Sequence, residues 1–296
     1  MIVNFIPGLF KKFVFSWLAF IVGPFIIVGS VSAAANKLTV ITSVPPHAFI
    51  VESLVGQQVK VISLVDQGSD PHTYSPSPKQ MLELSQAAVL FTAGLEFERG
   101  FLAKIQAINK KLVVTSLAEN EDGLGHDDTH EEHDGHEDLH TWLSPDTLTK
   151  QSETIYSELV KHLPAYRDSL DIRYAHLRER ISGIKIKLNG LLEPYKNRVF
   201  YVFHPAFGHF GEAFSLKQKA VEVDNKRPTP KQLQTIINQS LTDRVRVVFS
   251  QPQFDQRSAK VVADAIGGKV AILDPLKKDV FTNYIEIATS LADSFK

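Results

Sequence analysis

Hydrophobic residues along this chain form two kinds of pattern. Short apolar runs, rich in β-branched residues, alternate with longer segments in which apolar residues recur every three or four positions. Near-continuous apolar runs of this kind are typical of buried parallel strands separated by helices. The predicted strands are residues 38–42, 59–65, 87–92 and 111–115, followed by 198–203, 219–223, 244–250 and 269–273. This grouping predicts an α/β fold with two parallel β-sheets flanked by helices, and therefore two lobes.

The longest helical pattern lies between the two groups of strands. Its apolar residues recur at alternating spacings of four and three, at Leu170, Tyr174, Leu177, Ile181, Ile184, Leu188 and Leu191. A stripe sustained for about six turns predicts a helix of about 40 Å. A coiled-coil dimer is the alternative. However, the stripe covers only about three heptads and is bracketed by Pro164 and Pro194, which favours one stiff helix packed along both lobes.

Start signals for helices support this division of the chain. Ser77-Pro78, Ser144-Pro145 and Thr229-Pro230 each place an N-cap hydroxyl before a proline at the first helical position. We therefore predict an N-terminal lobe over residues 36–163, a connecting helix over 164–193 and a C-terminal lobe over 194–296.

The first 35 residues read as a secretory signal peptide. Two lysines precede the apolar run of residues 13–30, and small residues follow, with cleavage expected after Ala33 or Ala35. A retained membrane anchor is the alternative, but Pro24 interrupts the run. The chain has no cysteine, so a lipid-anchor cysteine, disulfides and thiolate ligands are all excluded. We expect a soluble periplasmic protein.

The composition is that of an ordinary globular protein and narrows the function only by exclusion. Hydrophobic residues make up 44% and charged residues 22% of 296 residues. The net charge of −1 gives no indication of nucleic-acid binding. The sequence also lacks a G-x-S-x-G, P-loop or dinucleotide-binding motif.

Four polar residues in distant segments are candidates for one metal site: His72, His140, His204 and Asp274. Three of them lie at or just beyond the carboxyl ends of predicted strands, where open α/β sheets bind ligands. Each alone would be an ordinary surface or turn residue. Because each lobe supplies two of them, we predict a metal in the cleft between the lobes. Three imidazoles and one carboxylate suit zinc.

An acidic, histidine-rich loop is predicted at residues 119–139, just before His140. Residues 112–149 contain no lysine or arginine, and such a segment cannot bury enough apolar surface to become ordered. Its histidines predict an auxiliary zinc-collecting loop, and a solvated acidic linker is the alternative; they are His126, His130, His133 and His136. The segment from His136 to His140 also matches H-E-x-x-H, with Glu137 as the base of a zinc hydrolase. That motif requires a helix, and no amphipathic pattern surrounds it here.

Six segments in order, DPHTYSPSP, LHTWLSP, FHPAFGHF, KRPTPKQL, SQPQF and LDPL, resemble one family. It is the zinc-binding periplasmic component of bacterial ABC transporters, the ZnuA-like branch of the cluster A-I metal-binding proteins. The resemblance runs from about Leu38 to the end of the chain. It implies two α/β lobes joined by a long rigid helix, a metal buried in the cleft, and delivery of that metal to an inner-membrane permease.

The resemblance also assigns the ligands. The family's positions fall on His72, His140 and His204, with Asp274 at the acidic position. The manganese branch typically has glutamate where this chain has His204, and a nitrogen donor there favours zinc. Lys79 and Gln80 replace an acidic residue of many relatives, His209 replaces a common tyrosine, and the disulfide of some relatives cannot form.

These observations predict a monomeric, high-affinity periplasmic zinc receptor with no catalytic residues. The alternatives are a manganese or iron receptor of the same fold, a zinc hydrolase that uses the segment around Glu137, and a zinc-buffering or adhesion protein without a transporter. His47 and His209 are predicted to support the site or the fold rather than to bind the metal.

Overall fold

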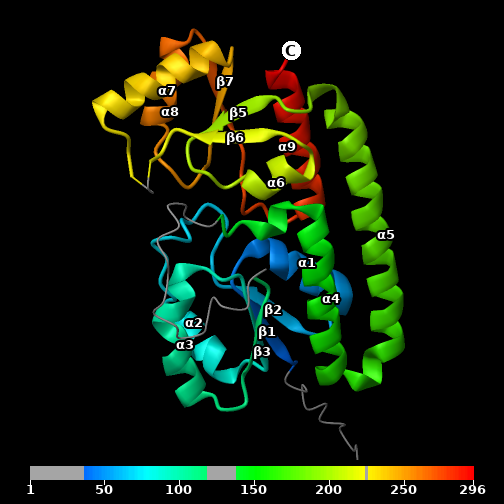
Figure 1. Cartoon of the computed structure of the whole chain (residues 1–296). Coiled ribbons are helices and arrows are strands. Elements are labelled where there is room, and N and C mark those ends of the chain that lie inside the picture. Colours follow the sequence, from blue (N-terminus) through cyan, green and yellow to red (C-terminus); the bar gives the residue numbers. More distant parts are fainter. Residues whose placement is uncertain (1–36, 119–137, 224–225) are drawn as a thin grey trace, which may run out of the picture. The chain divides into compact units, whose positions relative to one another are not determined.

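The computed structural model describes residues 37–118, 138–223 and 226–296 (Figure 1). The predicted signal peptide and nearly all of the predicted loop 119–139 lie outside these residues. Within them the chain forms two four-stranded sheets in which every pair of neighbouring strands is parallel. The prediction of two parallel α/β lobes is confirmed.

Both sheets have the same strand order. The N-terminal lobe has the order β2-β1-β3-β4 and the C-terminal lobe the order β6-β5-β7-β8. The first sheet consists of β1 (Thr39–Thr42), β2 (Lys60–Ser63), β3 (Val89–Thr92) and β4 (Val113–Ser116). The second consists of β5 (Val199–Val202), β6 (Lys217–Ala220), β7 (Val247–Ser250) and β8 (Lys269–Ile272). In each lobe the chain order of the strands therefore reverses beside the first strand, and the loops on either side of it can hold a ligand.

The strand β6 differs most from its prediction. The apolar run at 219–223 predicted it, but the strand spans Lys217–Ala220 and ends before the predicted run does. As an edge strand it has one neighbour, and its first three residues, Lys217, Gln218 and Lys219, are polar. Because the prediction relied on buried apolar runs, it placed this edge strand too far along the chain.

Helices cover the sheets, and three of them, α2, α4 and α7, begin where the capping signals predict. Besides α5 they are α1 (Pro45–Val55), α2 (Pro78–Gln86), α3 (Glu96–Ile108), α4 (Pro145–His162), α6 (Gly208–Ala213), α7 (Pro230–Thr242), α8 (Arg257–Ala265) and α9 (Val280–Ser294). Single 3₁₀ turns occur at η2 (Thr141–Leu143), η3 (Pro164–Tyr166) and η4 (Glu193–Tyr195). The side chains of Ser77, Ser144 and Thr229 each accept a hydrogen bond from a backbone N–H of the first turn that follows.

The predicted connecting helix is α5 (Arg167–Leu192), drawn in green in Figure 1. Its 26 residues span about 39 Å at 1.5 Å per residue. It packs against α1 and α4, which belong to the N-terminal half of the chain, and against α9 at the C-terminus. Its buried residues include Leu170, Leu177, Ile181 and Leu188 from the predicted stripe. The helix therefore packs against helices of both lobes.

One hydrophobic core extends from the N-terminal lobe into the C-terminal lobe. Phe200 and Val202 of β5 belong to this core, whereas Tyr201 and Phe203 point to a smaller cluster on the other face of the same sheet. Trp142 crosses the junction: its indole N–H donates to the carbonyl of Pro275 (2.8 Å), and its own carbonyl accepts from the hydroxyl of Tyr284 (2.6 Å). None of the helices in the described ranges has the length and apolar character needed to cross a membrane.

Candidate metal centre

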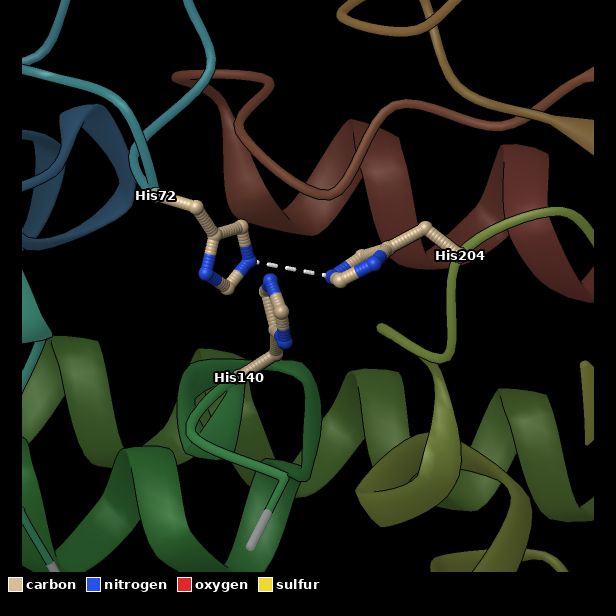
Figure 2. A group of neighbouring side chains, drawn as sticks. All are labelled: His72, His140 and His204. Carbon is tan, nitrogen blue, oxygen red and sulfur yellow. Dashed lines mark hydrogen bonds between the residues drawn. The ribbon is translucent and has the colours of Figure 1, made fainter. Parts of the chain in front are cut away.

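Three of the four predicted ligands come together (Figure 2). His72, His140 and His204 each offer a ring nitrogen, and these nitrogens lie within 4.8 Å of one another. Nε2 of His72 lies 3.1 Å from Nε2 of His204. Two nitrogens bound to one tetrahedral Zn²⁺ at ~2.0–2.1 Å would be roughly 3.4 Å apart, so small shifts would bring all three to one ion.

His72 lies in the loop between β2 and α2. Its backbone N–H donates to Oδ1 of Asp70 (2.9 Å), and the hydroxyl of Thr73 donates to Oδ2 of the same carboxylate (3.1 Å). This turn fixes the backbone of the loop. The His72 ring is only half-buried, and within the described residues no carboxylate is hydrogen-bonded to it. The local chain therefore positions the backbone of this histidine more firmly than its ring.

His140 immediately precedes η2 and is buried. Oδ1 of Asp138 accepts from both the backbone N–H (3.0 Å) and the ring Nδ1 (2.8 Å) of His140. The ring of Trp142 packs against it at a centroid distance of 5.3 Å. Trp142 is itself held by hydrogen bonds between the lobes. The His140 ring is therefore held both by packing against Trp142 and by its hydrogen bond to Asp138.

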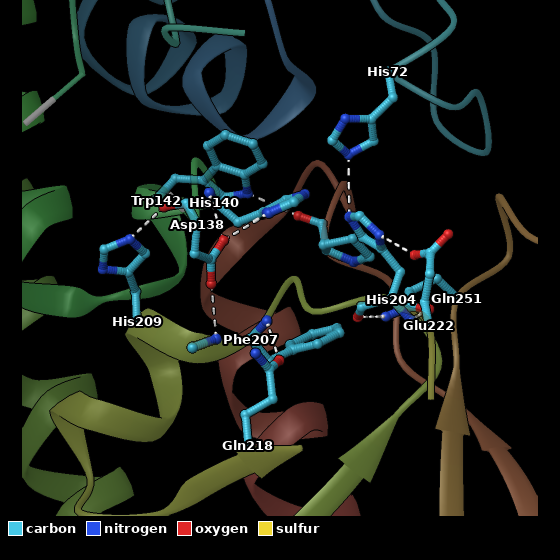
Figure 3. A network of polar contacts seen from close by, with 12 residues as sticks. His72, Asp138, His140, Trp142, His204, Phe207, His209, Gln218, Glu222 and Gln251 are labelled. Atoms are coloured by element: carbon cyan, nitrogen blue, oxygen red, sulfur yellow. Dashed lines mark hydrogen bonds and ion pairs between the residues drawn. The ribbon is translucent and has the colours of Figure 1, made fainter. Parts of the chain in front are cut away.

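His204 follows β5, separated from it only by Phe203, and is also buried. Gln251, which follows β7, holds its backbone: the side-chain oxygen accepts from His204 N–H (3.2 Å) and the amide donates to His204 C=O (2.7 Å). The ring Nδ1 donates to Oε2 of Glu222 at 2.7 Å (Figure 3). Both the backbone and the ring of this histidine are therefore fixed.

The carboxylates set the protonation pattern of the three rings. A carboxylate only accepts, so Nδ1 of His140 and Nδ1 of His204 carry hydrogen, and in the neutral rings Nε2 has the free lone pair. Nε2 of His72 then donates to Nε2 of His204. Burial, together with the nearby charges of His204 and His140, lowers the pKa of His72. A lowered pKa keeps this imidazole neutral near pH 7, as metal ligation requires.

Comparison with known proteins identifies the group to which this arrangement belongs. Residues 40–296 match the family model described as "ZnuA: Zinc-uptake complex component A periplasmic". The chain belongs to the ZnuA family. This is a family of metal-binding periplasmic receptors of ABC transporters, not of enzymes.

The relatives of this chain include proteins named for zinc uptake and proteins named for manganese transport. The high-affinity zinc uptake system protein ZnuA of Yersinia pestis is 26% identical over 278 residues, which cover 83% of this chain and 87% of that protein. The manganese ABC transporter substrate-binding lipoprotein PsaA of Streptococcus pneumoniae is 25% identical over 247 residues, 79% and 78% of the two chains. A crystal structure of ZnuA superposes with a TM-score of 0.80 at 30% identity, covering 88% of this chain and all of the other.

The fourth predicted ligand lies outside the group of three. The carboxylate of Asp274 accepts from the side-chain amides of Gln253 (2.8 Å) and Gln67 (3.3 Å) and from the backbone N–H of Leu276 (3.0 Å). Gln67 comes from the N-terminal lobe, so this contact joins the lobes. Coordination by Asp274 stays a prediction, because its carboxylate is not among the atoms within 4.8 Å of one another in the group of three.

The remaining predicted histidines divide into two sets. His47 is fully buried, its Nε2 lies 3.2 Å from Oε1 of Gln151, and burial lowers its pKa to about 4. His209 donates from Nε2 to the carbonyl of Asp138 (2.6 Å). Both therefore contact neighbours of the site. The auxiliary histidines, with Glu137 of the H-E-x-x-H segment, lie outside the described residues; they are His126, His130, His133 and His136.

Sequence reasoning missed two carboxylates of this ZnuA-family site, Asp138 and Glu222. A signal for Asp138 was present, because an aspartate two residues before a histidine commonly accepts from its backbone N–H. Glu222 was hidden because the predicted strand at 219–223 contained it. In the structure it follows β6, which pairs with β5, and its backbone N–H donates to the carbonyl of Phe203 (2.9 Å). That pairing places it beside His204.

Proposed function

We propose that this protein is a high-affinity periplasmic zinc receptor that captures Zn²⁺ and delivers it to an inner-membrane ABC permease. The observation that carries the proposal is the convergence of three imidazole nitrogens within 4.8 Å. Imidazole suits zinc, whereas carboxylate, carbonyl and water oxygens suit manganese. The membership of the ZnuA family supports transport as the purpose of the site.

The proposed ligands are His72, His140 and His204, with Asp274 in the fourth position. Asp274 already contacts Gln67 of the other lobe, so its carboxylate lies at the junction between the lobes. An ion held by loops of both lobes would be released when the lobes separate. That coupling suits a receptor that must bind tightly and still deliver its cargo.

The histidines of the acidic loop fit the same purpose. We propose that His126, His130, His133 and His136 bind zinc weakly and raise its concentration beside the tight site, as tethered sites do. The loop reaches the described part of the chain at Asp138, two residues before the ligand His140. Removal of residues 125–135 should therefore leave one tight site and fewer weak ones.

A hydrolase is less consistent with this arrangement. In a zincin the two histidines of H-E-x-x-H lie one helical turn apart on the same helix. Here His140 lies instead beside His72 and His204, which come from other segments, and it precedes a 3₁₀ turn. A site closed by four protein ligands would also lack the open position that an activated water needs.

Competition titration of the purified mature protein, residues 36–296, tests the proposal. We expect one Zn²⁺ per chain at the tight site, and we expect Zn²⁺ to displace Mn²⁺ when both are present in equal amounts. His204→Ala should abolish tight binding, while His209→Gln, at a histidine without a ring nitrogen in the group of three, should retain it. Displacement of Zn²⁺ by an equal amount of Mn²⁺ would overturn the assignment to zinc.

A further inference from the structure

We propose that Glu222 and Asp138 are positioning residues that orient two of the histidines and place negative charge beside the bound cation. The inference rests on the proposed function, the capture of a divalent cation by His72, His140 and His204. Figure 3 shows the two carboxylates on the outer sides of His204 and His140, away from the shared centre.

Glu222 is buried without a cationic side chain to balance it. Its side chain is 8% exposed, and its carboxylate accepts from Nδ1 of His204 at 2.7 Å. In the ranges that the structure describes, no lysine or arginine forms an ion pair with it. Burying a carboxylate without a balancing charge is costly, and proteins usually offset the cost with a paired cation or a metal. A divalent cation on the far side of the imidazole would supply that charge.

Asp138 holds its histidine in the same way and ties it to the C-terminal lobe. Oδ1 accepts from His140, and Oδ2 accepts from the backbone N–H of Gly208 at 2.9 Å. A Cβ atom at position 208 would lie only 2.7 Å from that Oδ2, so a larger residue there would displace the carboxylate.

These contacts fix the orientation of the three imidazole rings to different extents before a metal binds. The carboxylates already orient the Nε2 lone pairs of His140 and His204, whereas no carboxylate in the described residues is hydrogen-bonded to the ring of His72. A carboxylate that accepts from a ligating imidazole raises the basicity of the donor nitrogen, and its loss typically lowers metal affinity 10- to 100-fold.

The test compares Glu222→Gln and Glu222→Ala with the wild-type mature protein by competition titration with Zn²⁺. Glutamine keeps an oxygen that can accept from His204 but removes the charge, and alanine removes both. We expect an affinity loss of about 10-fold or more for Glu222→Gln and a larger one for Glu222→Ala. The matched control is Asp243→Asn. Asp243 is a carboxylate of the same lobe, but it accepts from Tyr201 (2.7 Å) and Lys219 (2.6 Å) rather than from a ligand.

A second cation separates charge from shape. Ag⁺ also binds imidazole but carries one charge, so removal of a neighbouring negative charge should weaken Zn²⁺ more than Ag⁺. A change in the orientation of the ring should weaken both alike. We expect the loss for Zn²⁺ in Glu222→Gln to exceed the loss for Ag⁺ by at least about threefold. Equal losses would overturn the role of charge, and Zn²⁺ affinity within threefold of wild type in both variants would overturn the proposal for Glu222.

Asp138 is tested both directly and through its partner Gly208. Gly208→Ala leaves every ligand in place and presses a methyl group against Oδ2 of Asp138. We expect Zn²⁺ affinity to fall several-fold, and Asp138→Asn to lower it by about 10-fold or more. Unchanged affinity in both variants would overturn the role of Asp138. The wild-type titration tests the proposed function independently of these variants. If the wild type prefers Mn²⁺, the same variants test both carboxylates with Mn²⁺ instead.

Discussion

The loop from β2 to α2 and the loop from β6 to α7 occupy corresponding places in the two lobes. Each leaves the edge strand that pairs with the first strand of its lobe, and each ends at the same capping box, Ser77-Pro-Lys-Gln80 or Thr229-Pro-Lys-Gln232. In both boxes the glutamine oxygen accepts from the N-cap backbone N–H at 2.9 Å. One loop supplies the proposed ligand His72, and the other supplies Glu222, which accepts a hydrogen bond from the proposed ligand His204 just after the neighbouring strand β5.

This difference divides the site into a prepared half around His204 and a less constrained half around His72. The C-terminal lobe holds His204 by its backbone, through Gln251, and by its ring, through Glu222. The N-terminal lobe holds only the backbone of His72, through Asp70. We therefore expect the cation to meet His204 and His140 first and to be enclosed when His72 turns towards it.

The largest expected effect comes from removing one ligand from each half. His204→Ala and His72→Ala should each lower Zn²⁺ affinity by about 100-fold or more, because each removes one of a few strong donors. They should differ in the metal-free protein. His204→Ala leaves the Glu222 carboxylate buried without its partner and should cost roughly 1–3 kcal/mol of unfolding free energy, whereas His72→Ala should cost much less. Chemical denaturation without metal measures both, and equal costs would contradict the division into halves.

The next effect concerns His47, which lies near the start of the helix after the first strand of the N-terminal lobe. Burial lowers the pKa of His47 to about 4, below the ordinary value of 6.5. Between these values the unfolded chain binds a proton that the folded protein does not, so stability falls as the pH drops from about 6.5 to 4. The total loss is roughly 3 kcal/mol.

His47→Gln keeps an amide donor for Gln151 and should remove this part of the acid sensitivity. The measurement is the unfolding free energy of the metal-free protein between pH 7 and pH 4.5. If the slope of His47→Gln matches that of the wild type, another buried group is responsible.

Asp274 gives the third effect. If it is the fourth ligand, Asp274→Asn should lower Zn²⁺ affinity by about 10-fold or more, because a neutral amide oxygen replaces an anionic donor. Asparagine can still accept from Gln253 at Oδ1 and loses only the longer, exposed hydrogen bond from Gln67, so the metal-free protein should lose little stability. Gln67→Ala is the counter-experiment: it removes a competitor for the carboxylate and should not weaken binding. An affinity within twofold of wild type for Asp274→Asn would leave the fourth position to water.

The sequence predicted the scaffold better than the surroundings of the metal. Apolar periodicity reports burial, so it located the two parallel sheets and α5, and the rule that ligands gather at the carboxyl ends of strands led to His72 and His204. It could not show that Asp274 would contact two glutamines, because Gln67 comes from the other lobe. Glu222 required the pairing of β6 with β5, and the exposed polar start of β6 gave no apolar signal for it. Predicting such partners requires strand register as well as strand position.

The smallest effect compares the two capping boxes directly. Ser77→Ala and Thr229→Ala each remove an N-cap hydroxyl that accepts from the glutamine N–H, at 3.3 Å and 3.4 Å, and each should cost about 1 kcal/mol of unfolding free energy. Their effects on binding should differ. Glu222 is anchored beside β5 by its own backbone N–H, which donates to Phe203, so loosening the start of α7 should leave Zn²⁺ affinity unchanged. The ring of His72 has no such support, and Ser77→Ala should weaken binding about twofold. Equal losses of affinity in the two variants would mean that both loops depend on their helix caps alike. The less constrained half of the site would then extend beyond the loop of His72.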